Sequence, residues 1–142
     1  MTIRLGIAGV RHGHVQYLFD TAAQRPDLVQ IVALAEDDPA LREQYAARLN
    51  PVAHHYANYH EMIAHEDLDV VGVAAVNNER GRIVCDSLAA GLHVIADKPL
   101  CTTLDDLAAI EAAWRRGDRL LSVMLEKRLW SPTLAARDLL AA

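Results

Sequence analysis

Short apolar runs alternate with helical periodicity along nearly the whole chain. Ile3 to Ala8 and Leu28 to Ala35 are almost entirely apolar, which is typical of strands that are buried on both faces of a sheet. Between these runs, the apolar residues from Val15 to Ala22 recur at the i, i+3, i+4 and i+7 positions of one helix face. The N-terminal part therefore predicts a strand, a helix and a second strand.

The same alternation continues toward the C-terminal end of the sequence. Further strands are expected at His54 to Ala57, Asp69 to Val76, Leu92 to Ala96 and Leu120 to Leu125. Helices are expected from Pro39 to about Leu49, near Tyr59 to His65, along the apolar stripe Val84 to Leu92, and from Pro132 to Ala141. Another helix is expected to begin after an N-cap at Thr103, with Trp114 in the core. Strands that alternate with helices form parallel sheets. We therefore predict an α/β fold over residues 1–142: a doubly wound, parallel, six-stranded sheet, that is, a Rossmann fold.

The size and charge of the chain indicate one globular domain. Its 142 residues can bury a single core, and 52% hydrophobic with 23% charged residues is ordinary for such a domain. The formal net charge of -5 argues against nucleic acid or an anionic membrane as a partner. Cys85 and Cys101 form no disulfide framework. Because no signal peptide or membrane-spanning run is evident, we expect a cytoplasmic protein with two free thiols.

Asp97-Lys98-Pro99 is the strongest candidate for chemistry. It follows the apolar run Leu92 to Ala96, so it is expected at the C-terminal end of a buried strand, where open α/β sheets bind their ligands. Lys98 is one of only two lysines in the chain, and an amine beside a carboxylate can donate hydrogen bonds or transfer protons. The alternative is an exposed turn in which both groups are simply hydrated; the preceding strand favours the functional interpretation.

A glycine-rich turn follows the first strand, with the sequence Gly6-Ile7-Ala8-Gly9-Val10-Arg11-His12-Gly13-His14. A dinucleotide pyrophosphate would bind there, on the free backbone N–H groups at the start of the next helix. The spacing departs from G-x-G-x-x-G, because Arg11 holds the position of the second glycine and His14 that of the third. Arg11 can compensate by pairing with phosphate. The alternative is that the glycines serve only the turn.

Acidic residues end the second expected strand, at Glu36 and Asp37. Glu36 lies about twenty residues beyond Gly13, where a carboxylate binds the adenosine ribose hydroxyls of NAD and repels the 2′-phosphate of NADP. The alternative is that Asp37 and Asp38 cap the next helix while Glu36 is exposed. Because the position and the sign of the charge agree, the sequence predicts NAD as the cofactor, with NADP less favoured.

These residues resemble the N-terminal half of the Gfo/Idh/MocA oxidoreductases. The resemblance covers essentially the whole chain, and its most specific part, Ala89 to Leu100, is similar to the family pattern AL-x-x-G-x-HV-x-x-EKP-[LM]. It also includes Gly6 to Gly9, Asp69 to Asn77, and Arg128 with Pro132. It implies a Rossmann domain that binds NAD(P) and a second, mainly antiparallel domain that contacts the substrate. The implied reaction is hydride transfer between nicotinamide and a carbon of a sugar, polyol or related compound.

The resemblance also implies roles for individual residues. Lys98 matches the family's catalytic lysine, which hydrogen-bonds the reacting oxygen and stabilises the developing alkoxide, and Pro99 would follow a cis peptide bond. Asp97 replaces the usual glutamate, Val76 the usual proline, and Arg80 stands where histidine is common. The implied cofactor contacts are Gly9, Val10, Arg11, His12, Gly13, His14, Glu36, Asp37, Val76, Asn77, Asp97, Lys98 and Arg128.

The chain stops where the family's substrate domain would begin. No residue after Arg128 matches the aspartate and histidine with which that domain completes proton transfer. We therefore expect residues 1–142 to be the cofactor domain of an oxidoreductase, which binds a dinucleotide without turning over the sugar- or polyol-like substrate by itself. The alternative is a non-enzymatic Rossmann module that binds NAD(H) or another nucleotide such as coenzyme A. Homo-oligomer formation is left open.

The histidines between His54 and His65 raise the question of a metal site. No carboxylate or cysteine lies at a recognisable ligand spacing from them. A hydrated loop and helix face explains these histidines better, so the sequence predicts no metal site.

Overall fold

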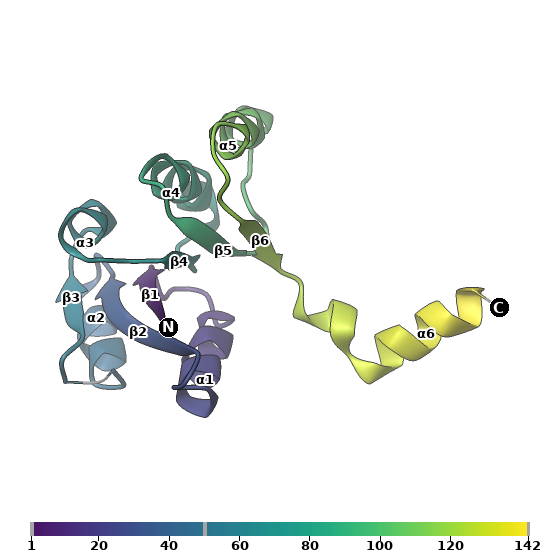
Figure 1. Ribbon diagram of the computed structural model, residues 1–142, viewed down its shortest axis with the longest axis horizontal. Coiled ribbons are helices and arrows are strands. Elements are labelled where there is room, and N and C mark those ends of the chain that lie inside the picture. Colours follow the sequence, from purple (N-terminus) through teal and green to yellow (C-terminus); the bar gives the residue numbers. More distant parts are fainter. Residues whose placement is uncertain (1, 50, 142) are drawn as a thin grey trace.

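A six-stranded parallel sheet forms the centre of the molecule (Figure 1). The computed structural model describes residues 2–49 and 51–141. Along the chain, the elements are β1 (Ile3–Ala8), α1 (Val15–Gln24), β2 (Val29–Ala35), α2 (Pro39–Ala46), β3 (His54–Tyr56), α3 (Tyr59–His65), β4 (Val70–Val73), α4 (Asn77–Ala89), β5 (His93–Asp97), α5 (Leu104–Arg115), β6 (Leu121–Met124), the short 3-10 helix η1 (Glu126–Leu129) and α6 (Ser131–Ala141).

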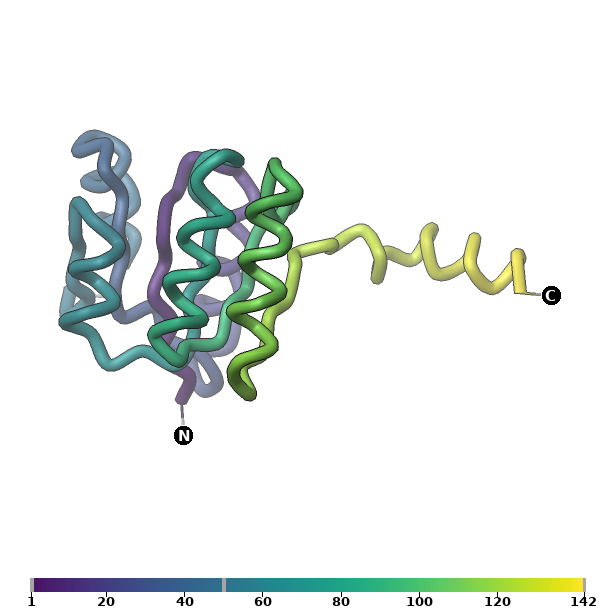
Figure 2. The backbone as a smooth tube through the Cα atoms, turned by 90° about the horizontal axis from the view of Figure 1, so that it is seen from above, coloured from purple at the N-terminus to yellow at the C-terminus, as the bar shows by residue number. Residues whose placement is uncertain are grey.

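The sheet has the doubly wound strand order β3-β2-β1-β4-β5-β6, and every neighbouring pair is parallel. Helices α3, α4 and α5 cover one face, and α1 and α2 cover the other (Figures 1 and 2). The strand order reverses between β1 and β4, and sheets of this kind bind their ligands at the C-terminal ends of the strands beside that point. The predicted Rossmann fold is confirmed.

Two hydrophobic cores hold the helices against the sheet, one on each face. Met62, Ile83 and Ile110 place α3, α4 and α5 in the first core. Leu18 and Phe19 of α1 belong to the second. Because the central strands contribute side chains to both cores, their sequences are apolar at nearly every position.

Most element boundaries agree with the prediction, and the largest differences have a local cause. The strand expected over Asp69 to Val76 ends at Val73, and a loop follows it. Helix α4 then begins at Asn77, well before the predicted apolar stripe. Its first turns bury Arg80 and Gly81 instead of apolar side chains, so the hydrophobic periodicity does not reveal them.

The helix predicted after Thr103 forms as α5. The side-chain oxygen of Thr103 accepts a hydrogen bond from the backbone N–H of Asp106 at 3.0 Å, which confirms the N-cap. The placement of Trp114 in the core is wrong, because the residue is 45% exposed. Ile110 fills the core instead, and helical spacing alone does not separate the buried stripe from its edge.

The C-terminal segment extends away from the sheet (Figures 1 and 2). The sequence did not predict η1, and α6 has no buried residue in its described part. Leu139 and Leu140 are therefore exposed apolar side chains.

Cys85 and Cys101 are free thiols, as predicted. Burial raises the pKa of both thiols, so they are protonated at neutral pH. Among the described residues, no helix combines the length and the apolar character needed to cross a bilayer.

Candidate functional site

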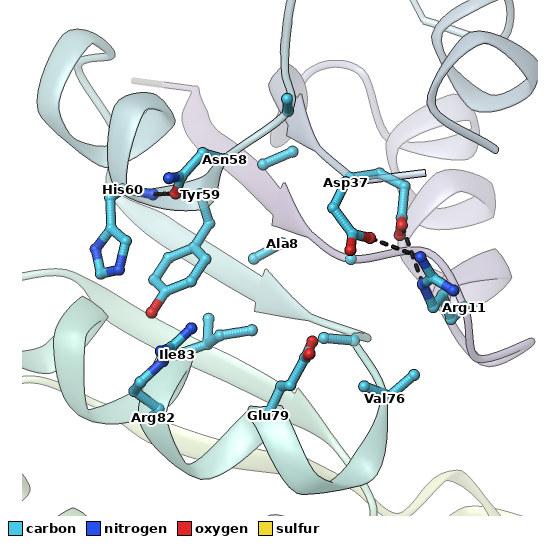
Figure 3. Close-up of a pocket in the computed structure, with 15 residues that line it drawn as sticks. Ala8, Arg11, Asp37, Asn58, Tyr59, His60, Val76, Glu79, Arg82 and Ile83 are labelled. Carbon is cyan, nitrogen blue, oxygen red and sulfur yellow. Dashed lines mark hydrogen bonds and ion pairs between the residues drawn. The ribbon is translucent and has the colours of Figure 1, made fainter. Parts of the chain in front are cut away.

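A pocket of about 240 Å³ opens at the C-terminal ends of β1, β2 and β4 (Figure 3). Arg11 and Asp37 lie on one side of it, residues from the start of α3 lie opposite, and α4 contributes Glu79 and Arg82. The complete lining is Ala8, Gly9, Arg11, Ala35, Glu36, Asp37, Ala57, Asn58, Tyr59, His60, Ala75, Val76, Glu79, Arg82 and Ile83. The pocket therefore contains five residues that the sequence predicts as cofactor contacts: Gly9, Arg11, Glu36, Asp37 and Val76.

Gly9 brings the glycine-rich turn against the end of β4. Its φ is +79°, a conformation that side-chain-bearing residues rarely adopt, and a Cβ atom there would lie 2.5 Å from the Cα atom of Ala75. Gly13, in the same turn, has open space where a Cβ would be. Gly9 is thus required by the close approach of two backbones, whereas Gly13 is not.

Replacing Gly9 by alanine is expected to lower the free energy of unfolding by at least about 2 kcal/mol, because left-handed strain adds to a backbone clash. The matched Gly13→Ala variant is expected to change it by no more than about 0.5 kcal/mol. Urea unfolding of the two variants measures the difference. Equal stability of the two would contradict the close packing of Gly9 on Ala75.

Arg11 and the acidic end of β2 form an ion-paired clamp beside the pocket. The Nε of Arg11 donates to Glu36 at 3.1 Å, and its Nη2 donates to Asp37 at 2.6 Å. Glu36 is only 4% exposed, and its carboxylate also accepts the backbone N–H groups of Val10 and Asp38. The exposed alternative for Glu36 is therefore wrong. The part of that alternative that assigns helix capping to Asp38 is confirmed, since Asp38 caps α2.

A hydrogen bond with Glu36 and the guanidinium of Arg11 lower the pKa of Asp37 from 3.8 to about 2. Replacing Arg11 by alanine removes the cation, so we expect the pKa of Asp37 to rise toward 3.8. A lowered carboxyl pKa stabilises the folded state above pH 3.8, and this contribution is lost as the pH falls through about 2. An NMR titration of the Asp37 carboxyl carbon in both proteins tests this, and identical pKa values would refute the clamp.

The wall opposite the clamp comes from residues that the sequence analysis did not select. Tyr59 and His60 begin α3 with their rings 4.0 Å apart, and the guanidinium of Arg82 lies 5.8 Å from the Tyr59 ring centre (Figure 3). The Tyr59 hydroxyl donates to Asp86 at 2.7 Å. Burial, followed by this hydrogen bond, raises the pKa of Tyr59 to about 12, so the hydroxyl remains protonated. The only sequence signal for this wall is the aromatic residue Tyr59, three positions after the end of β3.

Asp97, at the end of β5, is fully buried and its carboxylate faces two histidines. Its Oδ1 accepts the backbone N–H of Lys98 at 2.7 Å and lies 2.9 Å from Nδ1 of His14. Its Oδ2 contacts Nδ1 of His12. The structure thus joins residues from the first turn to a residue about eighty positions later, a pairing that the sequence does not reveal.

Arg80 completes this arrangement from α4 and is itself fully buried. Its Nε donates to the carbonyl of Ala75 at 2.8 Å, its Nη1 donates to the carbonyls of Lys98 and Pro99, and its Nη2 lies 3.4 Å from Oδ2 of Asp97. Burial lowers the pKa of Arg80, and Asp97 opposes that shift. The guanidinium therefore fastens the Asp97-Lys98-Pro99 turn to the end of β4.

The remaining predicted residues take different places. Lys98 is exposed at the end of β5, and the peptide bond between it and Pro99 is cis, as the resemblance implied. Asn77 is the first residue of α4, next to Val76 at the pocket. Arg128 is exposed on η1, beyond the edge strand β6, and is not among the residues that line the pocket.

Comparison with known proteins identifies relatives of this domain. Residues 3–125 match the family model described as an oxidoreductase family with an NAD-binding Rossmann fold, Gfo/Idh/MocA. The inositol 2-dehydrogenase/D-chiro-inositol 3-dehydrogenase of Shouchella clausii is 30% identical over 144 aligned positions, covering 99% of this chain and 40% of the relative. A dTDP-3,4-didehydro-2,6-dideoxy-alpha-D-glucose 3-reductase of Saccharopolyspora spinosa is 35% identical over 92 residues, covering 65% of this chain and 27% of the relative.

Solved structures show the same fold. The WlbA dehydrogenase of Bordetella pertussis, in complex with NADH and UDP-GlcNAcA, has a TM-score of 0.90 at 20% identity and covers 99% of this chain and 42% of its own. An NAD binding oxidoreductase of Klebsiella pneumoniae has a TM-score of 0.81 at 26% identity, with 99% and 39% covered. The chain thus spans about two fifths of the length of most of these proteins.

Proposed function

Because this chain belongs to the Gfo/Idh/MocA oxidoreductase family as its NAD-binding Rossmann domain, we propose that it binds NAD along the C-terminal edge of its sheet. The observation that carries the proposal is the pocket over β1, β2 and β4, which combines the glycine-rich turn with two carboxylates beside the point where the strand order reverses. In this arrangement, the adenosine half of NAD occupies the pocket. The nicotinamide half extends toward the end of β5 and Lys98.

The acidic end of β2 favours NAD over NADP. The clamp places two acidic residues, Glu36 and Asp37, against one cation, Arg11, at the ribose side of the pocket. Glu36 is enclosed by donors of its own loop, whereas the Asp37 side chain is 76% exposed. Asp37 is therefore the more accessible acceptor for the ribose hydroxyls, and both carboxylates repel a 2′-phosphate.

Lys98 supplies the charge at the other end of the cofactor. An exposed ammonium at the C-terminal end of β5 can hydrogen-bond a reacting oxygen and stabilise negative charge that develops on it. We assign to the whole protein a hydride transfer between nicotinamide and a carbon of a sugar, polyol or related compound. The relatives named as inositol dehydrogenases support this substrate class.

An NMR titration of the 15N-labelled chain tests the proposed site. Addition of NAD⁺ is expected to shift the backbone amide signals of Gly9 to His14 and of residues 36–38. Coenzyme A, one of the ligands considered for the rival non-enzymatic module, carries a 3′-phosphate that the same carboxylates repel. It is therefore expected to shift these signals little at equal concentration. Shifts produced by coenzyme A but not by NAD⁺ would favour the rival function.

A further inference from the structure

We propose that His12, His14 and Asp97 form a binding site for one divalent transition-metal ion of the zinc class. Each of these residues offers a ligand atom, and the three atoms lie within 4.8 Å of one another. Two imidazole nitrogens with one carboxylate oxygen suit such ions, and three protein ligands leave coordination positions open. The same residues are among the expected dinucleotide contacts, and the test below uses the chain without a dinucleotide, so the two proposals can fail separately.

The contacts of the carboxylate require positive charge between it and the two rings. An imidazole nitrogen and a carboxylate oxygen in contact repel each other through their lone pairs unless a proton or a metal ion lies between them. Both oxygens of Asp97 face an Nδ1 atom in this way, that of His14 at 2.9 Å and that of His12. Ligands that share one metal ion lie roughly 3 Å apart, so an ion between these atoms would supply that positive charge.

The Nδ1 atom of His12 is a separate indication of a ligand. It is buried, and among the described residues it is the one buried side-chain nitrogen or oxygen without a hydrogen-bond partner, since its contact with Asp97 lacks hydrogen-bond geometry. The backbone N–H of His12 donates to the carbonyl of Ala74 at 3.2 Å, which holds the residue in place. A buried imidazole nitrogen left in this state is suited to a metal bond.

A second carboxylate, that of Glu126, lies on the outer side of His14. The Nε2 of His14 lies 3.8 Å from a carboxylate oxygen of Glu126, on the side of the ring away from Asp97. At this distance the carboxylate adds negative charge beside the ring without a hydrogen bond to it. The charges around the site are those of Asp97, Glu126, Arg80 and Lys98; Arg80 opposes the ion, and the two carboxylates attract it.

Calorimetric titration of the full chain with Zn²⁺, without a histidine tag, tests the proposal. We expect one ion per chain, affinity at least about tenfold weaker in each of the variants His12→Gln and His14→Gln, and no comparable binding of Mg²⁺, which prefers oxygen ligands. The control is the variant His54→Gln/His55→Gln, which removes exposed histidines elsewhere and is expected to bind Zn²⁺ like the unmodified chain.

Absence of saturable Zn²⁺ binding, equal affinity for Mg²⁺, or loss of binding only in the control variant would overturn the site. A second measurement decides the matter if a variant fails to fold. In the 15N spectrum of the unmodified chain, Zn²⁺ is expected to shift the Nδ1 signals of His12 and His14. Shifts confined to the other histidines would also overturn the proposal.

Discussion

Replacement of Arg80 by methionine is expected to lower the free energy of unfolding by about 3–5 kcal/mol. The side chain is fully buried, so methionine fills much of its volume but cannot replace its charge or its donors. The carboxylate of Asp97 would lose the nearest buried cation, and the carbonyls of Ala75, Lys98 and Pro99 would lose their donor. Leaving one member of a buried ion pair without its partner is among the most destabilising single changes.

Urea unfolding at neutral pH measures this loss, and Arg82→Met is the matched control. Arg82 lies two residues along the same helix, but it is exposed, and its guanidinium lies 5.8 Å from the centre of the Tyr59 ring. We expect the control to change the free energy of unfolding by less than about 1 kcal/mol. Similar losses for both variants would show that Arg80 does not hold the turn at the end of β5.

Replacement of Lys98 by alanine is expected to reduce kcat about 10²–10³-fold in a full-length oxidoreductase that carries this domain, while NAD affinity stays within a few-fold. Lys98 is exposed, and its neighbours Asp97 and Arg80 hold the backbone of the turn without using its side chain. The change therefore removes the ammonium and leaves the turn in place. An interaction made chiefly in the transition state affects turnover much more than cofactor binding.

The other lysine of the chain provides the control for Lys98. Lys127 is exposed on η1, with its ammonium 5.6 Å from the ring centre of Trp130. We expect Lys127→Ala to retain normal turnover, which steady-state kinetics with saturating cofactor measures. Retained turnover in Lys98→Ala would remove Lys98 from the mechanism.

The sequence predicts the fold well because the signals of a doubly wound sheet are local. Apolar runs mark strands such as β1, which has its predicted bounds, and an N-cap such as Thr103 marks where a helix begins. Prediction fails where burial is polar or partial. The first turns of α4 bury Arg80 instead of an apolar side chain, so the apolar pattern does not predict them. Trp114 has the spacing of a buried helix position, but its side chain is exposed.

The candidate site is predicted residue by residue, but its internal pairing is not. The sequence selects Arg11, Glu36 and Asp97 individually, each by its position relative to a strand. Which charges meet depends on loops that lie far apart along the chain. From the sequence, Arg11 is predicted to pair with phosphate. In the structure, its guanidinium pairs with Glu36 and Asp37.

The same loops explain why the sequence raises the question of a metal site only for other histidines, where it predicts none. His54 to His65 attract notice because they are close together in the sequence, and His54 pairs with Glu66 in the structure. His12 and His14 meet their carboxylate only when the first turn reaches the end of β5. A metal site assembled across the sheet edge has no spacing signature.

The central claim is that this domain binds NAD through the pocket beside Glu36 and Asp37. Calorimetric titration of the purified chain with NAD⁺ and, separately, with NADP⁺ tests it most directly. We predict saturable binding of one NAD⁺ per chain and affinity for NADP⁺ at least about tenfold weaker, because the 2′-phosphate meets two carboxylates. Tighter binding of NADP⁺, or no saturable binding of NAD⁺, would contradict the account.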